Sequence, residues 1–342
     1  MTNSKYLVIL AIFTAVYIIL LFFRHVLENS IAIIPLKWQY LSAEQTRLFA
    51  LNEIVVANSD ILPPRERNVS ARILCRNSSI CTPVNRQYET MLRVSPKYKM
   101  VNCVVPKSMS TMMTSAMCYL YNEQEYERSG RSFDEEFITR FCKGKNEFNS
   151  MSDVRDAFNI SLIKTDWSIS MITRNPIDRF VSSYVDRCVR IVLKNSTSQC
   201  NGCGLNMTCF IEQEYERLMQ ISYKRITPIT MEDAHFFPQV WHCDLNEEIA
   251  YFEFFQYSSS AEDTLIPQFE DLMQRQNVPR RSIDYVKHEF LHKRSDHSTA
   301  GTPARNFFYA RLMSSPYLLE YIVKMFYHDF IKFYYPFPQG FQ

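Results

Sequence analysis

Glycine is scarce in this chain. The 342 residues include six glycines, and the first of them is Gly130. Both common nucleotide-binding fingerprints depend on glycine, since the Walker loop has the form G-x-x-x-x-G-K-[ST] and the dinucleotide-binding turn has the form G-x-G-x-x-G. Neither fingerprint is present, so a phosphate site before Gly130 would have to be built from other residues.

The chain also lacks a strong excess of charge of one sign. Its 38 basic and 36 acidic side chains give a formal net charge of +2. This balance excludes a strongly basic nucleic-acid-binding protein but permits local basic patches. We therefore expect no nucleic-acid partner, and we expect any anion site to be local.

Charged residues are absent from Tyr6 to Phe23, a run flanked by Lys5 and Arg24. The run just reaches the length that crosses the hydrocarbon core of a bilayer. We predict a transmembrane signal anchor over residues 6–23, with residues 1–5 as a short cytoplasmic tail. The alternative is a signal peptide cleaved near Ser30-Ile31-Ala32, although the apolar part of such peptides is usually shorter.

No cysteine precedes Cys75, and the rest of the chain contains all ten. An even count with a cluster at Cys200, Cys203 and Cys209 is typical of an oxidising compartment, so we predict disulfides without assigning the pairs. A zinc site is the alternative and would need thiolates. N-x-S/T sequons also favour a lumenal, glycosylated body, and they begin at Asn68, Asn77, Asn159, Asn195 and Asn206.

The part between the anchor and residue 98 has an irregular pattern. Residues 24–97 contain Pro63-Pro64, two sequons and scattered charges, which indicates a lumenal stem. Three later segments have the pattern of a strand followed by a helix. This order predicts an α/β catalytic domain over residues 98–342, with a mainly parallel central sheet flanked by helices.

The first strand–helix unit carries a candidate anion site. A β-rich run, Val101 to Val105, precedes Lys107, Ser108, Ser110 and Thr111, and apolar positions 112, 113, 116, 117 and 120 then follow at helical spacing. A helix start presents backbone N–H groups, and here an ammonium and several hydroxyls accompany them. Such a group attracts phosphate or sulfate.

The second unit places an arginine at the end of a predicted strand. Ile169 to Thr173 is followed by Arg174 and Pro176, and Pro176 fits the first turn of a helix. Open α/β sheets bind ligands at the carboxyl ends of their strands, and a guanidinium suits phosphate. Ser182 lies about two helical turns beyond Arg174. Taken alone, Arg174 is better explained by a surface salt bridge, but together with the Lys107 unit it favours a phosphate site.

Both units resemble motifs of the Golgi carbohydrate sulfotransferases. Pro106 to Thr111 is similar to their 5′-phosphosulfate-binding loop, and Arg174 to Tyr184 is similar to their 3′-phosphate motif. The resemblance implies 3′-phosphoadenosine 5′-phosphosulfate (PAPS) as co-substrate, held by Lys107, Ser108, Met109, Ser110, Thr111, Arg174 and Ser182. It also implies a P-loop-like sulfotransferase fold and a Golgi membrane location, as a single-pass type II protein with a lumenal catalytic domain.

Later segments are similar to the chondroitin 4-O-sulfotransferase group. They are Asp233 to Gln239, the pair Ser298-Thr299, and Tyr327 to Tyr334. The resemblance adds Ser298 and Thr299 to the donor site and implies a glycan or proteoglycan acceptor, such as GalNAc of chondroitin-like chains. The insert from Cys200 to Cys209 and the stretch from Gly301 to Arg305 depart from the group's pattern and leave the acceptor sugar open.

Transfer of a sulfuryl group to a hydroxyl needs a base and a charge at the leaving group. We predict His235 as the base, because histidine titrates near neutral pH and this one lies in a segment that the resemblance marks. A structural histidine is the alternative. Lys107 would neutralise the departing 5′-phosphate. His235, His242 and Cys243 lack a fourth ligand, so no metal is predicted.

A basic segment follows Pro279. Arg280, Lys287 and Arg294 recur every seven residues and would share one face of a continuous helix. We predict that this face binds an anionic acceptor, with a solvated charged face as the alternative. The apolar helix from Tyr317 to Phe333 is predicted to pack in the core.

Two other function classes are alternatives to a sulfotransferase. A lumenal kinase-like enzyme would need glycine-rich and acidic metal-binding signatures that the sequence lacks. A catalytically inactive lumenal glycoprotein with the same fold, binding a glycan or a nucleotide, is the alternative that stays open. The presence of Lys107, Arg174 and Ser182 favours catalysis.

Overall fold

The computed structural model describes residues 43–342, with gaps at 66–67, 77–78, 85–89, 135–140, 162–165, 194–199, 226–228, 259 and 295–297. The chain divides into two compact units, Met1–Glu53 and Ile54–Gln342. Helix α2 (Ala43–Ala57) crosses the boundary between them. The sheet, the helices around it and the candidate site all belong to the second unit.

The sheet of this unit is mixed. Its described strands are β1 (Leu92–Ser95), β2 (Met100–Cys103), β3 (Glu147–Phe148), β4 (Ser168–Arg174) and β5 (Phe252–Tyr257), in the spatial order β3-β1-β2-β4-β5. The β2–β4 and β4–β5 pairs are parallel, whereas β1 runs antiparallel to both of its neighbours. The prediction of a mainly parallel sheet was therefore wrong at one edge, because β1 and β2 form a hairpin through the turn at Pro96–Tyr98.

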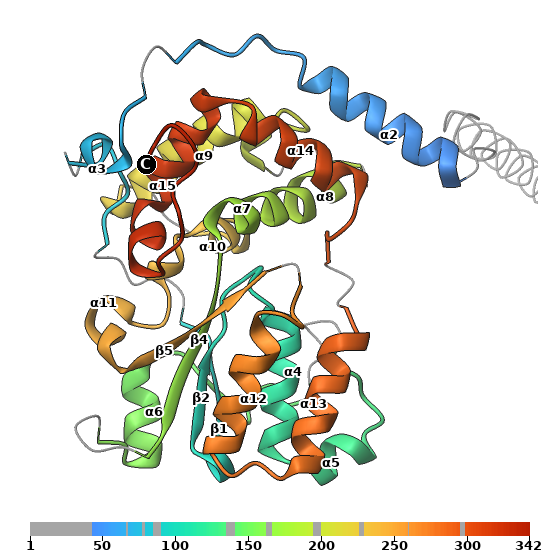
Figure 1. Ribbon diagram of the computed structural model, residues 1–342, viewed down its shortest axis with the longest axis vertical. Coiled ribbons are helices and arrows are strands. Elements are labelled where there is room, and N and C mark those ends of the chain that lie inside the picture. Colours follow the sequence, from blue (N-terminus) through green and yellow to red (C-terminus); the bar gives the residue numbers. More distant parts are fainter. Residues whose placement is uncertain are drawn as a thin grey trace, which may run out of the picture. The chain divides into compact units, whose positions relative to one another are not determined.

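Helices cover both faces of the sheet (Figure 1). One face packs on α4 (Ser110–Tyr121), α5 (Glu123–Arg128), α12 (Leu265–Arg275) and α13 (Arg280–His292). The hydrophobic core on the other face includes residues of α6 (Met151–Phe158), α7 (Pro176–Tyr184), α9 (Met207–Ser222), α10 (Met231–Phe236), α14 (Pro303–Met313) and α15 (Pro316–Lys332), with α14 packed on α7 and α9 packed on α15. Short helices complete this unit, namely α3 (Ala71–Leu74), α8 (Arg190–Val192) and α11 (Leu245–Glu248).

Alternation of side chains along the strands builds the two cores. In β4, Ile169 and Met171 pack in one hydrophobic cluster and Ile172 packs in the other. Because successive strand residues point to opposite faces, a central strand covered on both sides is apolar almost throughout. The prediction of a sheet flanked by helices is confirmed.

The two predicted strand–helix units are also confirmed. The first is β2 followed by α4, and the second is β4 followed by α7. Asn175 caps α7, since its Oδ1 accepts a hydrogen bond of 2.9 Å from the Ile177 N–H, and Pro176 occupies the first turn. A short π-helix at Val185–Val189 then connects α7 to α8. The predicted late helix corresponds to α15, whose apolar residues lie in the core.

All ten cysteines are paired, which confirms the prediction of disulfides. The bridges are Cys75–Cys81, Cys103–Cys243, Cys118–Cys142, Cys188–Cys200 and Cys203–Cys209. Cys188, Cys200 and Glu232 lie close together, but both sulfurs belong to a disulfide. The zinc alternative for the Cys200–Cys209 cluster is therefore wrong, because no thiolate is left there.

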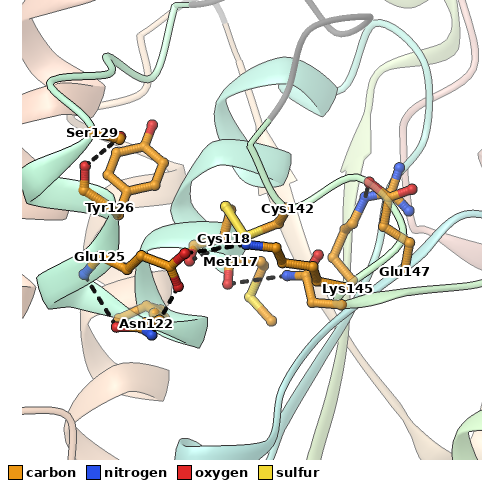
Figure 2. Close-up of a disulfide and its surroundings, with 12 residues drawn as sticks. Met117, Cys118, Asn122, Glu125, Tyr126, Ser129, Cys142, Lys145 and Glu147 are labelled. Atoms are coloured by element: carbon orange, nitrogen blue, oxygen red, sulfur yellow. Dashed lines mark hydrogen bonds and ion pairs between the residues drawn. A yellow bond between two sulfur atoms is a disulfide. The ribbon is translucent and has the colours of Figure 1, made fainter.

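The Cys118–Cys142 bridge fastens the C-terminal end of α4 (Figure 2). Around it, the Asn146 side chain donates to the Met117 carbonyl at 3.3 Å, and Lys145 forms an ion pair with Glu125 at 3.3 Å. The bridge and these contacts join α4 and α5 to the turn that precedes β3. A disulfide and side-chain contacts within the protein therefore fix this end of α4.

Part of the predicted stem belongs to the second unit and packs against its later segments. The Ala71 N–H donates to the Phe341 carbonyl at 2.7 Å, and Trp241 Nε1 donates to the Pro83 carbonyl at 2.7 Å. The predicted domain boundary at residue 98 stays a prediction, and the first strand begins at Leu92.

Among the described residues, none of the helices combines the length and the apolar character needed to cross a bilayer. The predicted anchor at 6–23 and the predicted tail at 1–5 lie outside the described residues, as do the sequons at Asn77 and Asn195. Asn68 and Asn159 are exposed, whereas the side chain of Asn206 is half-buried and caps α9. Glycosylation at these positions stays a prediction.

Candidate active site

A cavity of about 490 Å³ lies where β2, β4 and β5 end. Most of the predicted donor and base residues line it, namely Lys107, Met109, Ser110, Thr111, Arg174, Ser182, His235, Ser298 and Thr299. Ser108 is buried instead, and its hydroxyl donates to Gln239 Oε1 at 3.4 Å. The structure thus brings together groups that lie up to 192 positions apart, from Lys107 to Thr299.

The loop between β2 and α4 adopts an unusual backbone without glycine. Lys107 and Met109 have φ values of 67° and 60°, in the left-handed region that glycine occupies most easily. Met109 is the N-cap residue of α4, and its side chain makes no capping hydrogen bond. The N-terminal N–H groups of a helix have no partners within the helix, so this turn can receive an anion.

Lys107 lines the cavity, but most of its side chain is buried. Its side chain is 9% exposed and forms an ion pair with Asp186, which also contacts Arg190 at 2.7 Å. Burial lowers the pKa of Lys107 to about 8, and the negative charge of Asp186 opposes this effect. The ammonium therefore carries most of its charge at neutral pH and loses it at mildly alkaline pH.

Arg174 ends β4 and points into the same cavity. Its Nη1 donates to the Lys107 carbonyl at 3.0 Å, and its guanidinium lies 5.2 Å from the centre of the Tyr257 ring. Its Nε is buried and has no hydrogen-bond partner among the described residues. Burial also lowers the pKa of Arg174, so an anionic ligand would stabilise its charge. The alternative of a surface salt bridge is wrong, because the side chain is buried.

Thr299, from the predicted Ser298-Thr299 pair, lies next to Ser182 in the segment that resembles the 3′-phosphate motif. The Thr299 and Ser182 hydroxyls lie 3.2 Å apart, and both residues are buried. Ser298 is exposed at the cavity edge. Their approach supports the predicted grouping of Ser182, Ser298 and Thr299 around one ligand.

His235 belongs to α10 and has a defined tautomer. Its Nδ1 lies 2.8 Å from the Met231 carbonyl, and because a carbonyl can only accept, Nδ1 must carry the proton. Nε2 is then left with a lone pair. Burial lowers the pKa of His235 to about 4, and the neighbouring charge of Lys107 contributes to the decrease. The imidazole is therefore neutral at pH 7 and able to accept a proton.

The predicted basic face is not continuous. Helix α13 ends at His292, and Lys293 is extended, so Arg294 does not share a helix with Arg280 and Lys287. Arg294 lines the cavity, whereas Arg280 and Lys287 both contact Glu270 on α12. The expected alignment of the three residues was wrong, because the helix stops before the third. An acceptor-binding role stays a prediction, and the geometry favours it only for Arg294.

The segment from His288 to His292 also has the form H-E-x-x-H, which is found in zinc proteases. The two imidazoles stack at 4.3 Å on the surface of α13. Glu289, however, faces inward and accepts hydrogen bonds of 3.3 Å from Ser132 and from the Phe133 N–H. Its carboxylate is therefore structural and does not act as a base on a metal-bound water.

Several residues of the site were missed by the sequence analysis. Asp186, Arg187 and Lys293 line the cavity, and Gln239 and Arg179 support its walls. On the helical segment that follows Arg174, Arg179 lies three residues before Ser182 and Asp186 lies four residues after it. That spacing was the available signal, because residues three or four apart share a helix face.

A buried ammonium and a buried guanidinium flank an open helix N-terminus at the ends of parallel strands. This arrangement is typical of α/β proteins that bind phosphorylated or sulfated ligands. Comparison with known proteins gives the family. Residues 90–336 match the sulfotransferase family, and the chain belongs to it.

The chain is also similar to three proteins from Caenorhabditis elegans, two of which have sulfotransferase in their names. Vep-2, whose name gives it provisionally as a sulfotransferase, is 62% identical over 311 residues, 91% of this chain and 97% of that protein. The uncharacterized protein C18B2.2 is 41% identical, over 90% of this chain and 86% of its own length. Carbohydrate sulfotransferase chst-1 is 28% identical, over 70% and 74%. No solved structure matches the chain.

Proposed function

We propose that this protein transfers the sulfuryl group of PAPS to a hydroxyl of a carbohydrate. The observation that carries the proposal is the meeting of the Lys107 loop, Arg174 with Ser182, and His235 around one cavity. Membership of the sulfotransferase family supports it. The carbohydrate is suggested by the relative named carbohydrate sulfotransferase chst-1.

The chemistry of the cavity fits a donor with two separate anionic ends. Lys107 and the first turn of α4 would hold the 5′-phosphosulfate, and Arg174, Ser182 and Thr299 would hold the 3′-phosphate. The unpartnered Nε of Arg174 gives a buried donor for a phosphate oxygen. Cationic side chains outnumber acidic ones in the wall, which contains Lys107, Arg174, Arg187, Lys293, Arg294 and Asp186.

The reaction assigns a role to each of two side chains. The acceptor hydroxyl oxygen attacks sulfur, its proton passes to His235 Nε2, and the bond from sulfur to the 5′-phosphate oxygen breaks. The electron pair of that bond stays on the phosphate, where the Lys107 ammonium stabilises the charge. The protein therefore contributes mainly positioning and electrostatics. No metal is needed for this scheme.

For the acceptor we propose a glycan or proteoglycan, with GalNAc of chondroitin-like chains as the first candidate. Arg187, Lys293 and Arg294 at the cavity suit a chain that carries carboxylates or sulfates. The competing function is an inactive lumenal glycoprotein that binds a glycan or a nucleotide with the same residues. We also propose a type II Golgi membrane protein with a lumenal catalytic domain, which five disulfides and exposed sequons support.

Radiolabelled PAPS tests the reaction. The full-length chain, expressed through a secretory pathway, is incubated with desulfated chondroitin, dermatan, heparan and N-glycan acceptors, beside a Lys107→Ala variant. We expect label on one acceptor class with the wild type and none with the variant. Binding of the product 3′-phosphoadenosine 5′-phosphate (PAP) without transfer to any acceptor would favour the inactive binding protein. Absence of PAP binding by folded protein would refute the donor.

A further inference from the structure

A buried polar network lies behind the cavity wall. It consists of Asp329 on α15, Gln239 after α10, and Arg179 and Ser183 on α7. All four residues are fully buried, and none of them lines the cavity. Buried polar groups at this depth need complete hydrogen bonding, so each contact constrains the segments that it joins.

Gln239 fixes the end of β4. Its Oε1 accepts from the Arg174 N–H at 2.9 Å, and its Nε2 donates to the Arg174 carbonyl at 2.9 Å. The amide thus pairs with the Arg174 backbone as a neighbouring strand would. The Ser108 hydroxyl also donates to Gln239 Oε1. One side chain therefore sets the backbone from which Arg174 enters the cavity.

Asp329 holds Gln239 in turn. Its carboxylate accepts from the Gln239 N–H at 2.8 Å, from the Val240 N–H at 3.0 Å and from Gln239 Nε2 at 3.4 Å. Burial raises the pKa of Asp329 to about 6, while the charge of Arg179 and these hydrogen bonds oppose the increase. An ionised carboxylate only accepts hydrogen bonds, so the nitrogen of the Gln239 amide must face Asp329. This contact fixes the orientation of the amide.

A second arm of the network reaches the predicted base. Arg179 Nε donates to the Pro106 carbonyl at 3.1 Å, and its Nη2 donates to the His235 carbonyl at 3.4 Å. The Ser183 hydroxyl donates to the same His235 carbonyl at 2.8 Å. Arg179 thus contacts both the donor loop and His235, whereas Ser183 contacts the His235 segment.

We propose that Gln239 and Ser183 are positioning residues of the transfer site with separable effects, Gln239 on donor affinity through Arg174 and Ser183 on turnover through His235. The inference rests on the proposed function, since it assigns Arg174 to the donor and His235 to the acceptor proton. Small displacements of reacting groups are costly in catalysis, so near-isosteric changes in this network have measurable effects.

Gln239→Met and Ser183→Ala in the full-length protein test the separation. We expect Gln239→Met to weaken PAP binding by about tenfold or more, measured by titration calorimetry. We expect Ser183→Ala to leave PAP affinity within about twofold and to lower kcat by about tenfold. Gln276→Met is the matched control, because Gln276 bonds Ser168 at the opposite end of β4, at 2.6 Å, and it should change neither quantity.

Double mutants distinguish positioning from a general loss of structure. Gln239→Met should add no further loss of PAP affinity in an Arg174→Ala background, and Ser183→Ala should add no further loss of kcat in a His235→Gln background. If Gln239→Met does not fold, Asp329→Asn takes its place, because an amide nitrogen facing the Gln239 N–H displaces that segment.

Additive losses in both cycles, or wild-type PAP affinity in the Gln239 and Asp329 variants, would overturn the inference. Failure of the wild type itself to bind PAP is a different result and would refute the proposed donor. The two failures are therefore distinguishable in one set of titrations.

Discussion

The two ends of helix α4 differ in how their polar groups are satisfied. At the start, Lys107 and Met109 hold left-handed backbone conformations, and the N-cap residue Met109 makes no side-chain capping hydrogen bond. At the other end, the Asn122 N–H donates to the Cys118 carbonyl at 3.4 Å, the Asn122 side chain caps the following helix α5, and the Cys118–Cys142 bridge fastens the last turns. Contacts within the protein hold one end, the closed end, whereas residues at the other end line the cavity.

The difference separates function from stability along one element. Left-handed residues other than glycine cost roughly 1 kcal/mol each, so the loop before α4 is maintained against a local preference. The closed end carries a cross-link and a cap that stabilise the fold. We therefore expect changes at the start of α4 to affect ligand binding and changes at its end to affect unfolding.

Lys107→Ala should give the largest effect. Loss of the ammonium removes the charge next to the leaving phosphate, and we expect kcat/KM for PAPS to fall by roughly 100- to 1000-fold. Transfer of labelled sulfate measures this loss. Lys97→Ala is the control, because that lysine is paired with Glu123 at the other end of α4 and does not line the cavity, and it should retain activity. Equal losses in both variants would remove the distinction between the two lysines.

Replacing Cys118 and Cys142 together by serine should lower the stability of the protein and leave its PAP affinity nearly unchanged. The bridge closes a loop with a sequence separation of 24, and its loss should lower the free energy of unfolding by about 3 kcal/mol. Urea denaturation measures the change. PAP affinity should stay within about twofold of the wild type. A large drop in affinity without loss of stability would show that the closed end also shapes the site.

The pH dependence of kcat/KM should sharpen the assignment of Lys107. Burial lowers its pKa to about 8, so the ammonium is charged below that pH and neutral above it. We expect kcat/KM for PAPS to fall by about tenfold per pH unit above pH 8. Lys107→Arg, if active, should lack this decrease. A wild-type profile that stays flat to pH 10 would contradict the assignment.

Asn122→Ala should have the smallest effect. The variant loses the cap of α5 at the closed end of α4, and we expect a stability decrease of about 1 kcal/mol. Asn122→Asp keeps an oxygen acceptor and should unfold like the wild type. Thermal melting of the two variants, with PAP titration beside it, measures both quantities. A change in PAP affinity would contradict the separation of the two ends.

Local patterns predicted the parts of the site that are continuous in sequence. The Lys107 loop lies between β2 and α4, and Arg174 ends β4 just before α7, so the strand–helix pattern marked both positions. The role of Ser182, within α7, came from the family resemblance. The mixed edge of the sheet was not predicted. Strand β1 has the sequence LRVS, in which Arg93 is buried and lies 3.9 Å from Glu147, and a charged residue hides the strand pattern.

Contacts between distant segments could not be predicted in this way. Asp186 was missed because its partner Lys107 lies 79 positions earlier, and the spacing of Asp186 from Ser182 does not show which basic residue it contacts. Gln239 and Asp329 were missed for the same reason, although both lie in segments that the resemblance marked. The error at Arg294 came from extending a heptad spacing past the end of α13.

Calorimetric titration of the full-length protein with PAP asks whether this cavity binds the sulfate donor. We expect one binding site, whose affinity falls by roughly 100-fold in Arg174→Ala and stays unchanged in Arg280→Ala, where the arginine is exposed and paired with Asp284. No PAP binding by the folded wild-type protein, or equal affinity in all three proteins, would contradict the assignment of this cavity to the sulfate donor.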